Sequence, residues 1–158
     1  MFKKFCAALV FVICSVAIFV PKVSATNWVW VYSDSDKSIW IDNDSISRGG
    51  SYSDYDFKAI FKRTYSEEGR RKYIKKFISA GFNLQKIYKL SYCIELDYFK
   101  NVNGVKSMAM PDLDYYTDNG EKIFEGFHYK QIQYVPITSL NSYIETMYNA
   151  AYARVRGK

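Results

Sequence analysis

The sequence predicts an α+β domain in which an antiparallel meander sheet of about six strands, with one inserted helix, is covered by a long C-terminal amphipathic helix. Apolar and polar residues alternate through residues 55–65 and 86–99, which is the period of half-buried strands. Short turn-forming segments separate most of the strands, so neighbouring strands are expected to pair antiparallel. Residues 138–156 have helical spacing instead.

This C-terminal stretch is expected to close the core. Its apolar residues recur at gaps of three and one in alternation, which places them on one stripe of an α-helix. Pro136 precedes the stretch, Thr138 and Ser139 can cap its first turn, and Gly157 can end it. The stripe consists of Leu140, Tyr143, Ile144, Met147, Tyr148, Ala151, Tyr152 and Val155.

Two strands of a hairpin, a long strand and a helix are expected in the first half of the domain. Residues 27–33 and 37–42 form the hairpin, because both are rich in strand formers and an Asp-Ser-Asp turn joins them. Residues 55–65 alternate as a half-buried strand. Ser66 then begins the inserted helix, since two glutamates follow it, and the helix runs to about Ala80.

The second half is expected to supply the remaining strands. Pro111 lies within residues 105–117 and must sit at an edge or a bulge. Asn119-Gly120 predicts a type I′ hairpin turn before the last strand region, residues 122–134. In residues 86–99 one apolar set is expected to face the core and one polar set to face away. The apolar set is Leu90, Tyr92, Ile94, Leu96 and Tyr98, and the polar set is Lys89, Ser91, Cys93, Glu95 and Asp97.

Residues 1–25 have the features of a secretory signal peptide. Two lysines form a positive start, residues 5–20 are apolar, and Val23-Ser24-Ala25 is a pattern that signal peptidase cuts. An uncleaved anchor is the alternative, but the apolar run is shorter than the roughly 20 residues that span a bilayer. We therefore expect export to the periplasm, the cell surface or the medium. Residues 26–158 would form one mature domain without a transmembrane span.

Removal of this segment changes the charge and the cysteine content. The full chain has 22 basic and 16 acidic residues, and three of the lysines lie in the segment, so the mature net charge is +3 rather than +6. This balance gives little reason to expect nucleic acid as a partner. Only Cys93 remains of the three cysteines, which excludes an internal disulfide and a cysteine metal site in the mature chain.

Short motifs along the mature chain carry a family resemblance. Trp28 precedes Ile39-Trp40-Ile41-Asp42 and Ser45-Ile46; Tyr115-Tyr116-Thr117-Asp118-Asn119-Gly120 and then Val135-Pro136 with Ser139-Leu140 follow. The chain resembles the surface-adhesin protein E family of small secreted bacterial proteins. The resemblance implies an antiparallel sheet with a long C-terminal helix, export and no catalysis. It also implies binding to host extracellular-matrix or plasma proteins, as in the best-known members, although this chain lacks the paired cysteines of some members.

The sequence offers little for catalysis or metal binding. His128 is the only histidine, lies between two aromatic residues of a predicted strand, and has no Gly-x-Ser-x-Gly elbow to serve. Cys93 is expected to be a thiol on a polar face, and an intermolecular disulfide stays open if it is exposed. A calcium loop starting at Asp34 would lack the required Gly and Glu. We expect no enzymatic activity, no cofactor and no metal.

A basic run on the inserted helix is the strongest binding candidate. Five of seven consecutive residues are basic, namely Arg70, Arg71, Lys72, Lys75 and Lys76. Either this run is a solvated face, or it binds an anionic partner such as a sulfated glycan, an acidic protein or an envelope polymer. Any exposed residue among Trp28, Trp30 and Trp40 would be a second partner anchor.

The leading hypothesis is an exported, non-catalytic binding protein, an adhesin that contacts a host matrix or plasma protein or an anionic glycan. The alternative is a periplasmic structural or envelope-homeostasis protein without a host ligand. A periplasmic and a surface location both stay open, as does a homodimer.

Overall fold

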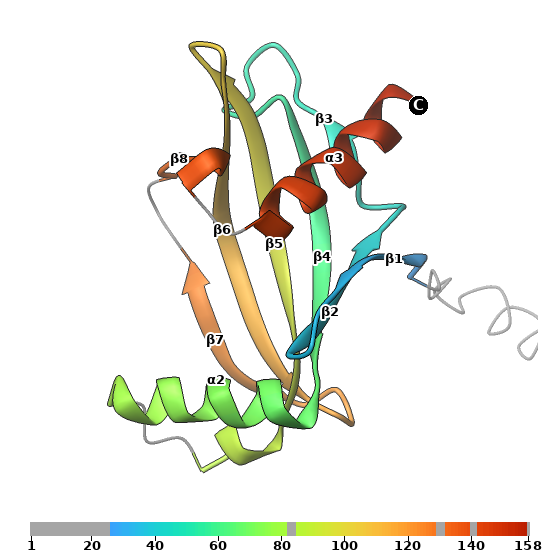
Figure 1. The fold of residues 1–158 in the computed structure, drawn as a ribbon. Coiled ribbons are helices and arrows are strands. Elements are labelled where there is room, and N and C mark those ends of the chain that lie inside the picture. Colours follow the sequence, from blue (N-terminus) through green and yellow to red (C-terminus); the bar gives the residue numbers. More distant parts are fainter. Residues whose placement is uncertain (1–25, 82–84, 129–131, 140–141, 158) are drawn as a thin grey trace, which may run out of the picture.

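The computed structural model describes residues 26–81, 85–128, 132–139 and 142–157. The fold is α+β: a single antiparallel sheet has the strand order β1-β2-β4-β5-β6-β7, with β3 beside β4 and β8 beside β6, and two helices lie on it (Figure 1). This confirms the predicted class. The expected signal peptide lies outside the described residues. Among those residues, no helix has the length and apolarity needed to cross a membrane.

Most element boundaries lie within a few residues of the predicted ones. The predicted strand over residues 86–99 begins only at Leu90, because residues 87–89 form a 3-10 turn, and it continues to Val102. The C-terminal helix begins later than its spacing predicts, because a short 3-10 turn precedes it and takes up Thr138 and Ser139, the expected caps. Leu140 lies outside the described residues. The elements are β1 (Trp28–Ser33), β2 (Lys37–Asp42), β3 (Ser47–Arg48), β4 (Phe57–Tyr65), α2 (Glu67–Ser79), η1 (Ile87–Lys89), β5 (Leu90–Val102), β6 (Val105–Thr117), β7 (Lys122–His128), β8 (Val135–Pro136), η2 (Ile137–Ser139) and α3 (Ser142–Arg156).

The two helices cover the same face of the sheet at opposite ends of its long strands (Figure 1). α3 packs Met147, Ala151 and Val155 into a cluster with residues of β2, β4 and β5. Tyr143 of the predicted stripe is half-buried and Tyr152 is 41% exposed. The other described residues of the stripe are buried as predicted, namely Ile144, Met147, Tyr148, Ala151 and Val155. α2 packs the half-buried Tyr73, Ile74 and Phe77 onto a second cluster, which consists of Leu90, Cys93, Leu113 and Tyr115.

The predicted orientation of β5 is wrong. Cys93, Glu95 and Asp97 lie on the helix-covered face and are at most 1% exposed. Their partners on β4 are inward-facing residues such as Phe61, which stands opposite Glu95, and side chains opposite each other share a face. A register shift follows Leu90, so Leu90 stays buried while the next apolar residues turn to the other face. Those residues are Tyr92, Ile94, Leu96 and Tyr98, all half-buried.

Pro111 lies at a bulge, as predicted. Leu96 pairs with Asp112 and Tyr98 pairs with Ala109, so Met110 and Pro111 together oppose a single residue of β5, Asp97. The proline therefore needs no place in the hydrogen-bond ladder to β5. The bulge also lets the side chains of Met110 and Pro111 line a pocket described below.

The hairpin turns differ from the prediction at one place. Asn103 and Gly104 both have positive φ, 52° and 85°, and connect β5 to β6 in two residues, as a type I′ turn requires. Between β6 and β7 only Gly120 has positive φ among the turn residues. The predicted type I′ turn at Asn119-Gly120 is wrong because that loop holds three residues: the Thr117 N–H donates to the Glu121 carbonyl at 2.9 Å.

Candidate binding groove between the helices

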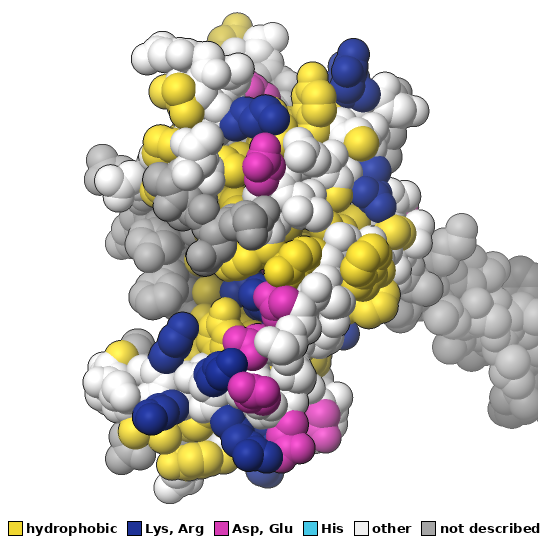
Figure 2. All heavy atoms as spheres, viewed as in Figure 1, with side chains coloured by type: hydrophobic (Ala, Val, Ile, Leu, Met, Phe, Trp, Pro, Cys, Tyr) yellow, Lys and Arg dark blue, Asp and Glu magenta, His cyan; other side chains and the backbone are white. Residues whose placement is uncertain are grey.

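Two adjoining hollows lie over the sheet between α2 and α3. The first, here called the lysine groove, has a volume of about 910 Å³. The second, the apolar pocket, has a volume of about 400 Å³. Tyr143 at the start of α3 lines both. In Figure 2, basic and acidic side chains gather around the depression between the body of the molecule and α2.

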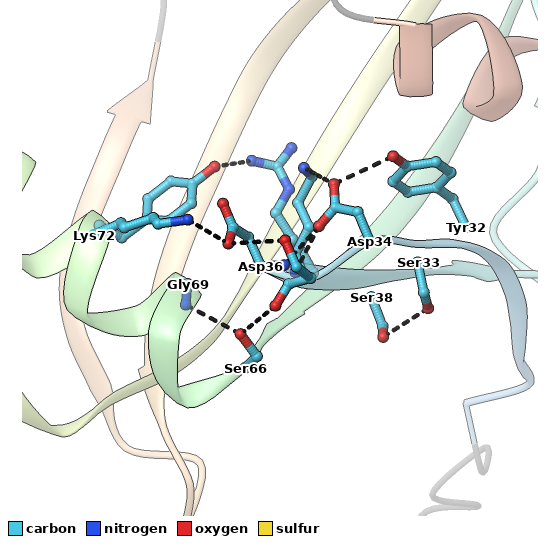
Figure 3. Close-up of polar contacts among 12 residues, drawn as sticks. Tyr32, Ser33, Asp34, Asp36, Ser38, Ser66, Gly69 and Lys72 are labelled. Carbon is cyan, nitrogen blue, oxygen red and sulfur yellow. Dashed lines mark hydrogen bonds and ion pairs between the residues drawn. The ribbon is translucent and has the colours of Figure 1, made fainter.

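The N-terminal end of α2 is fixed to the turn between β1 and β2 (Figure 3). The Ser66 hydroxyl accepts from the Gly69 N–H at 3.0 Å and donates to the Ser35 carbonyl at 2.7 Å. Gly69 lies so close to the backbone of Asp36 that a Cβ on Gly69 would overlap the Asp36 carbonyl. Lys72 Nζ donates to the Asp36 carboxylate at 2.8 Å. These contacts set the wall of the lysine groove.

Acidic neighbours neutralise two members of the basic run. Arg71 pairs with Glu67 one turn earlier on α2. Lys72 pairs with Asp36 at 2.8 Å and with Glu68 at 3.0 Å. The run is therefore not the uniform basic face that its sequence predicts, because nearby carboxylates match part of its charge.

The charges of the other three members of the basic run are not neutralised by an ion pair within the described structure. Lys75 and Lys76 are exposed, Arg70 is half-buried, and none of them makes an ion pair with another described residue. Lys76 also lies over the ring of Tyr73, with Nζ 5.4 Å from the ring centre. Lys75 and Lys76 line the lysine groove and are its unmatched cations.

The opposite wall of the lysine groove carries a matched charge pair. Asp34 accepts from Lys37 Nζ at 2.7 Å and from the backbone N–H groups of Asp36 and Lys37 at 2.8 and 2.9 Å. Burial by itself would raise the pKa of Asp34, but these hydrogen bonds hold it at about 2. Asp34 thus offsets Lys37 and Asp36 offsets Lys72, so the groove keeps a net positive charge from Lys75 and Lys76.

A polar row lies on the sheet between the two apolar clusters. Arg63 Nη2 donates to both carboxylate oxygens of Glu95 at 2.8 Å, and the Nη1 of Arg63 lies 3.5 Å from the Tyr73 hydroxyl. The Arg63 and Glu95 side chains are 11% and 2% exposed. The Nε of Arg63 has no hydrogen-bond partner within the described part of the chain. Sequence reasoning missed this row.

Asp97 stands beside the pair in the same row. Both of its carboxyl oxygens are buried without a hydrogen-bond partner among the described residues. Burial, and then the negative charge of Glu95, raise the pKa of Asp97 well above its usual range. The folded state therefore favours the protonated, uncharged form of the Asp97 carboxyl.

The thiol of Cys93 lies in the core beneath α2. The Cys93 thiol is free, fully buried, and 3.3 Å from the Tyr65 hydroxyl. Burial raises the pKa of the Cys93 thiol to about 11. The expected position on the polar face is wrong, and because the thiol is buried the condition for an intermolecular disulfide is not met in this fold. The reason is the orientation of β5.

The three tryptophans named as candidates are not among the described residues that line the two hollows. His128 ends β7, where its backbone pairs with Asp112, and its side chain is outside the described part of the structure. Trp30 is 56% exposed on the edge strand β1, and its Nε1 donates to the Ser33 hydroxyl at 2.9 Å. Trp28 and Trp40 are half-buried.

Neither similarity to known proteins nor a set of metal ligands among the described residues identifies a function for this site. Within the described ranges, no group of three or more His, Cys, Asp or Glu side chains is placed to hold a metal ion. No family model, curated protein or solved structure matches the chain.

Proposed function

We propose that the chain is an exported, non-catalytic binding protein, an adhesin in its mode of action, that contacts an anionic partner through the lysine groove. One observation carries the proposal: Asp34 and Asp36 match two lysines of the groove, whereas Lys75 and Lys76 are exposed without an ion pair in the described structure. Unmatched cations along an open hollow attract polyanions and accelerate their association.

The partner class that fits best is a sulfated or acidic polymer on a host matrix, or an acidic host protein. Ammonium groups on flexible stems bind such anions as point charges and need no fixed ligand geometry. Export rests on the apolar run and processing pattern of residues 1–25. The resemblance of the Trp28, Tyr115–Gly120 and Val135-Pro136 motifs to the surface-adhesin protein E family supports the same partner class.

A heparin column tests the role of the two lysines. The double variant Lys75→Gln/Lys76→Gln should elute at clearly lower salt than the wild type, because two unmatched charges are lost. The matched control is Lys89→Gln/Lys106→Gln, which removes the same charge from exposed positions outside the groove. Equal shifts for both pairs would show that only net charge matters and would overturn the assignment of the groove.

A second experiment separates a host partner from an envelope partner. The mature domain is immobilised and exposed in parallel to host plasma and matrix extract and to the envelope polymers of the producing cell. Retention of host components that Lys75→Gln/Lys76→Gln abolishes supports the proposal. Retention of envelope polymers alone favours the structural or envelope-homeostasis alternative.

A further inference from the structure

The apolar pocket differs from the lysine groove in the side chains that line it. It lies on the other side of Tyr143, and its apolar wall comes from the bulge of β6, from β8 and from α3. Met110, Pro111, Val135 and Ile144 are part of this wall. A volume of about 400 Å³ falls within the range of small-molecule sites.

One polar group of the pocket lacks a partner. Arg63 lines the pocket, and its side chain is 11% exposed. The guanidinium lies 5.7 Å from the ring centre of Tyr143, and its Nη2 is held by Glu95. The buried Nε–H has no acceptor within the described residues. A buried donor without an acceptor is unfavourable, so a ligand oxygen that reaches this N–H would be bound selectively.

The charges around the pocket restrict the ligand further. Glu95 also lines the pocket and already matches the charge of Arg63 at 2.8 Å. An anionic ligand beside Arg63 would place a second negative charge near Glu95 in a poorly solvated site, which is costly. A cation would meet the positive charge of Arg63. An uncharged ligand avoids both costs.

We propose that the apolar pocket binds a small, uncharged, mostly apolar molecule whose carbonyl or hydroxyl oxygen accepts a hydrogen bond from Arg63. This site is distinct from the lysine groove and does not depend on the proposed adhesin function. The ligand would lie between the bulge of β6 and the start of α3, with its oxygen directed to the sheet.

Three naphthalene probes of similar size test the proposal on the wild-type protein by isothermal titration calorimetry. The neutral ketone 2-acetylnaphthalene should bind about tenfold more tightly than 2-ethylnaphthalene, which has no acceptor. The free energy of a hydrogen bond to a charged group corresponds to about that ratio of affinities. It should also bind more tightly than the anion 2-naphthoate. Equal affinities for the ketone and the hydrocarbon, strongest binding of the anion, or no binding of the ketone would each overturn the proposal.

A matched pair of valine variants locates the bound probe. Val135 and Val105 are 40% and 42% exposed, and of the two only Val135 lines the pocket. Val135→Trp narrows the pocket without altering the core and should lower the affinity for 2-acetylnaphthalene at least about tenfold. Val105→Trp should leave the affinity unchanged. A similar effect of both variants, or of neither, would place the probe elsewhere and overturn the site.

Discussion

Arg63 and Glu95 form a buried diagonal pair across β4 and β5. They are not opposite each other in the ladder, because Arg63 stands opposite Cys93 and Glu95 opposite Phe61. The Arg63 guanidinium reaches along β5 to Glu95, which is two residues beyond Cys93 on the same face. It donates to both carboxylate oxygens of Glu95 at 2.8 Å. The pair lies where the apolar clusters under α2 and α3 end, so it is enclosed by core residues on both sides.

The first prediction concerns this pair. Arg63→Met leaves the Glu95 carboxylate buried without its partner and should lower the free energy of unfolding by about 3–5 kcal/mol. The double variant Arg63→Met/Glu95→Met should be less destabilised than the single variant, because no charge remains buried. Urea unfolding of the three proteins measures both differences.

The exposed pair Arg71–Glu67 is the control for this prediction. Both side chains are more than two-thirds exposed, 73% and 69%, so Arg71→Met should change stability by less than about 1 kcal/mol. A loss for Arg63→Met as small as that for Arg71→Met would contradict the buried arrangement.

The second prediction concerns the pH dependence of stability at Asp97. Burial and the neighbouring Glu95 raise the pKa of Asp97 in the folded state. Above about pH 4 the unfolded chain ionises this carboxyl, whereas the folded chain keeps it protonated until the pH approaches its raised pKa. The folded state then binds more protons, so its stability falls as pH rises toward the folded pKa of Asp97, by at most about 1.4 kcal/mol per pH unit.

Asp97→Asn removes this slope. The stability of the variant relative to the wild type should therefore increase as pH rises from about pH 4 toward the folded pKa of Asp97, as measured by denaturant unfolding at several pH values. Asp34→Asn gives the opposite sign: the folded pKa of Asp34 is about 2, so its contribution is present above about pH 4 and is lost as pH falls toward 2. Parallel profiles for wild type and Asp97→Asn would argue against a buried, protonated carboxyl.

Local periodicity predicts the elements of this fold but not which face of a strand is covered. Met147, Ala151 and Val155 of the helical stripe are buried as their spacing requires. In β5 both sets of alternating residues are consistent with a strand, and the apolar set was the natural choice for the core. The pairing of β5 with β4 instead places Glu95 opposite Phe61 and Asp97 opposite Ala59, on the face that the helices cover.

In the candidate site too, a feature within one element could be predicted from the sequence, whereas a contact between distant residues could not. The basic run of α2 is visible in the sequence, whereas the pairing of Lys72 with Asp36 joins residues 36 positions apart. Arg63 could have been placed inward, because it continues the alternation of Phe57, Ala59 and Phe61 along β4. The inward position of its partner Glu95 could not be predicted in this way, since the pairing of β5 with β4 decides which face of β5 is covered.

The last prediction concerns the contact that fixes α2. Replacing a glycine within a helix by alanine ordinarily stabilises the helix by about 1 kcal/mol. At Gly69 the new Cβ would overlap the carbonyl of Asp36 and lie 2.8 Å from its Cα, and both are backbone atoms that cannot rotate away. Gly69→Ala should therefore destabilise the protein by about 1–3 kcal/mol, the range of overpacked sites.

Displacement of α2 from the β1–β2 turn should also separate Lys72 from Asp36 and speed hydrogen exchange of the α2 amides. Ser79→Ala at the exposed end of the same helix is the control and should change stability by no more than about 0.5 kcal/mol. Thermal unfolding and amide exchange measured on both variants decide the matter. A more stable Gly69→Ala protein would mean that helix propensity outweighs the close approach, and that other contacts hold α2 on the sheet.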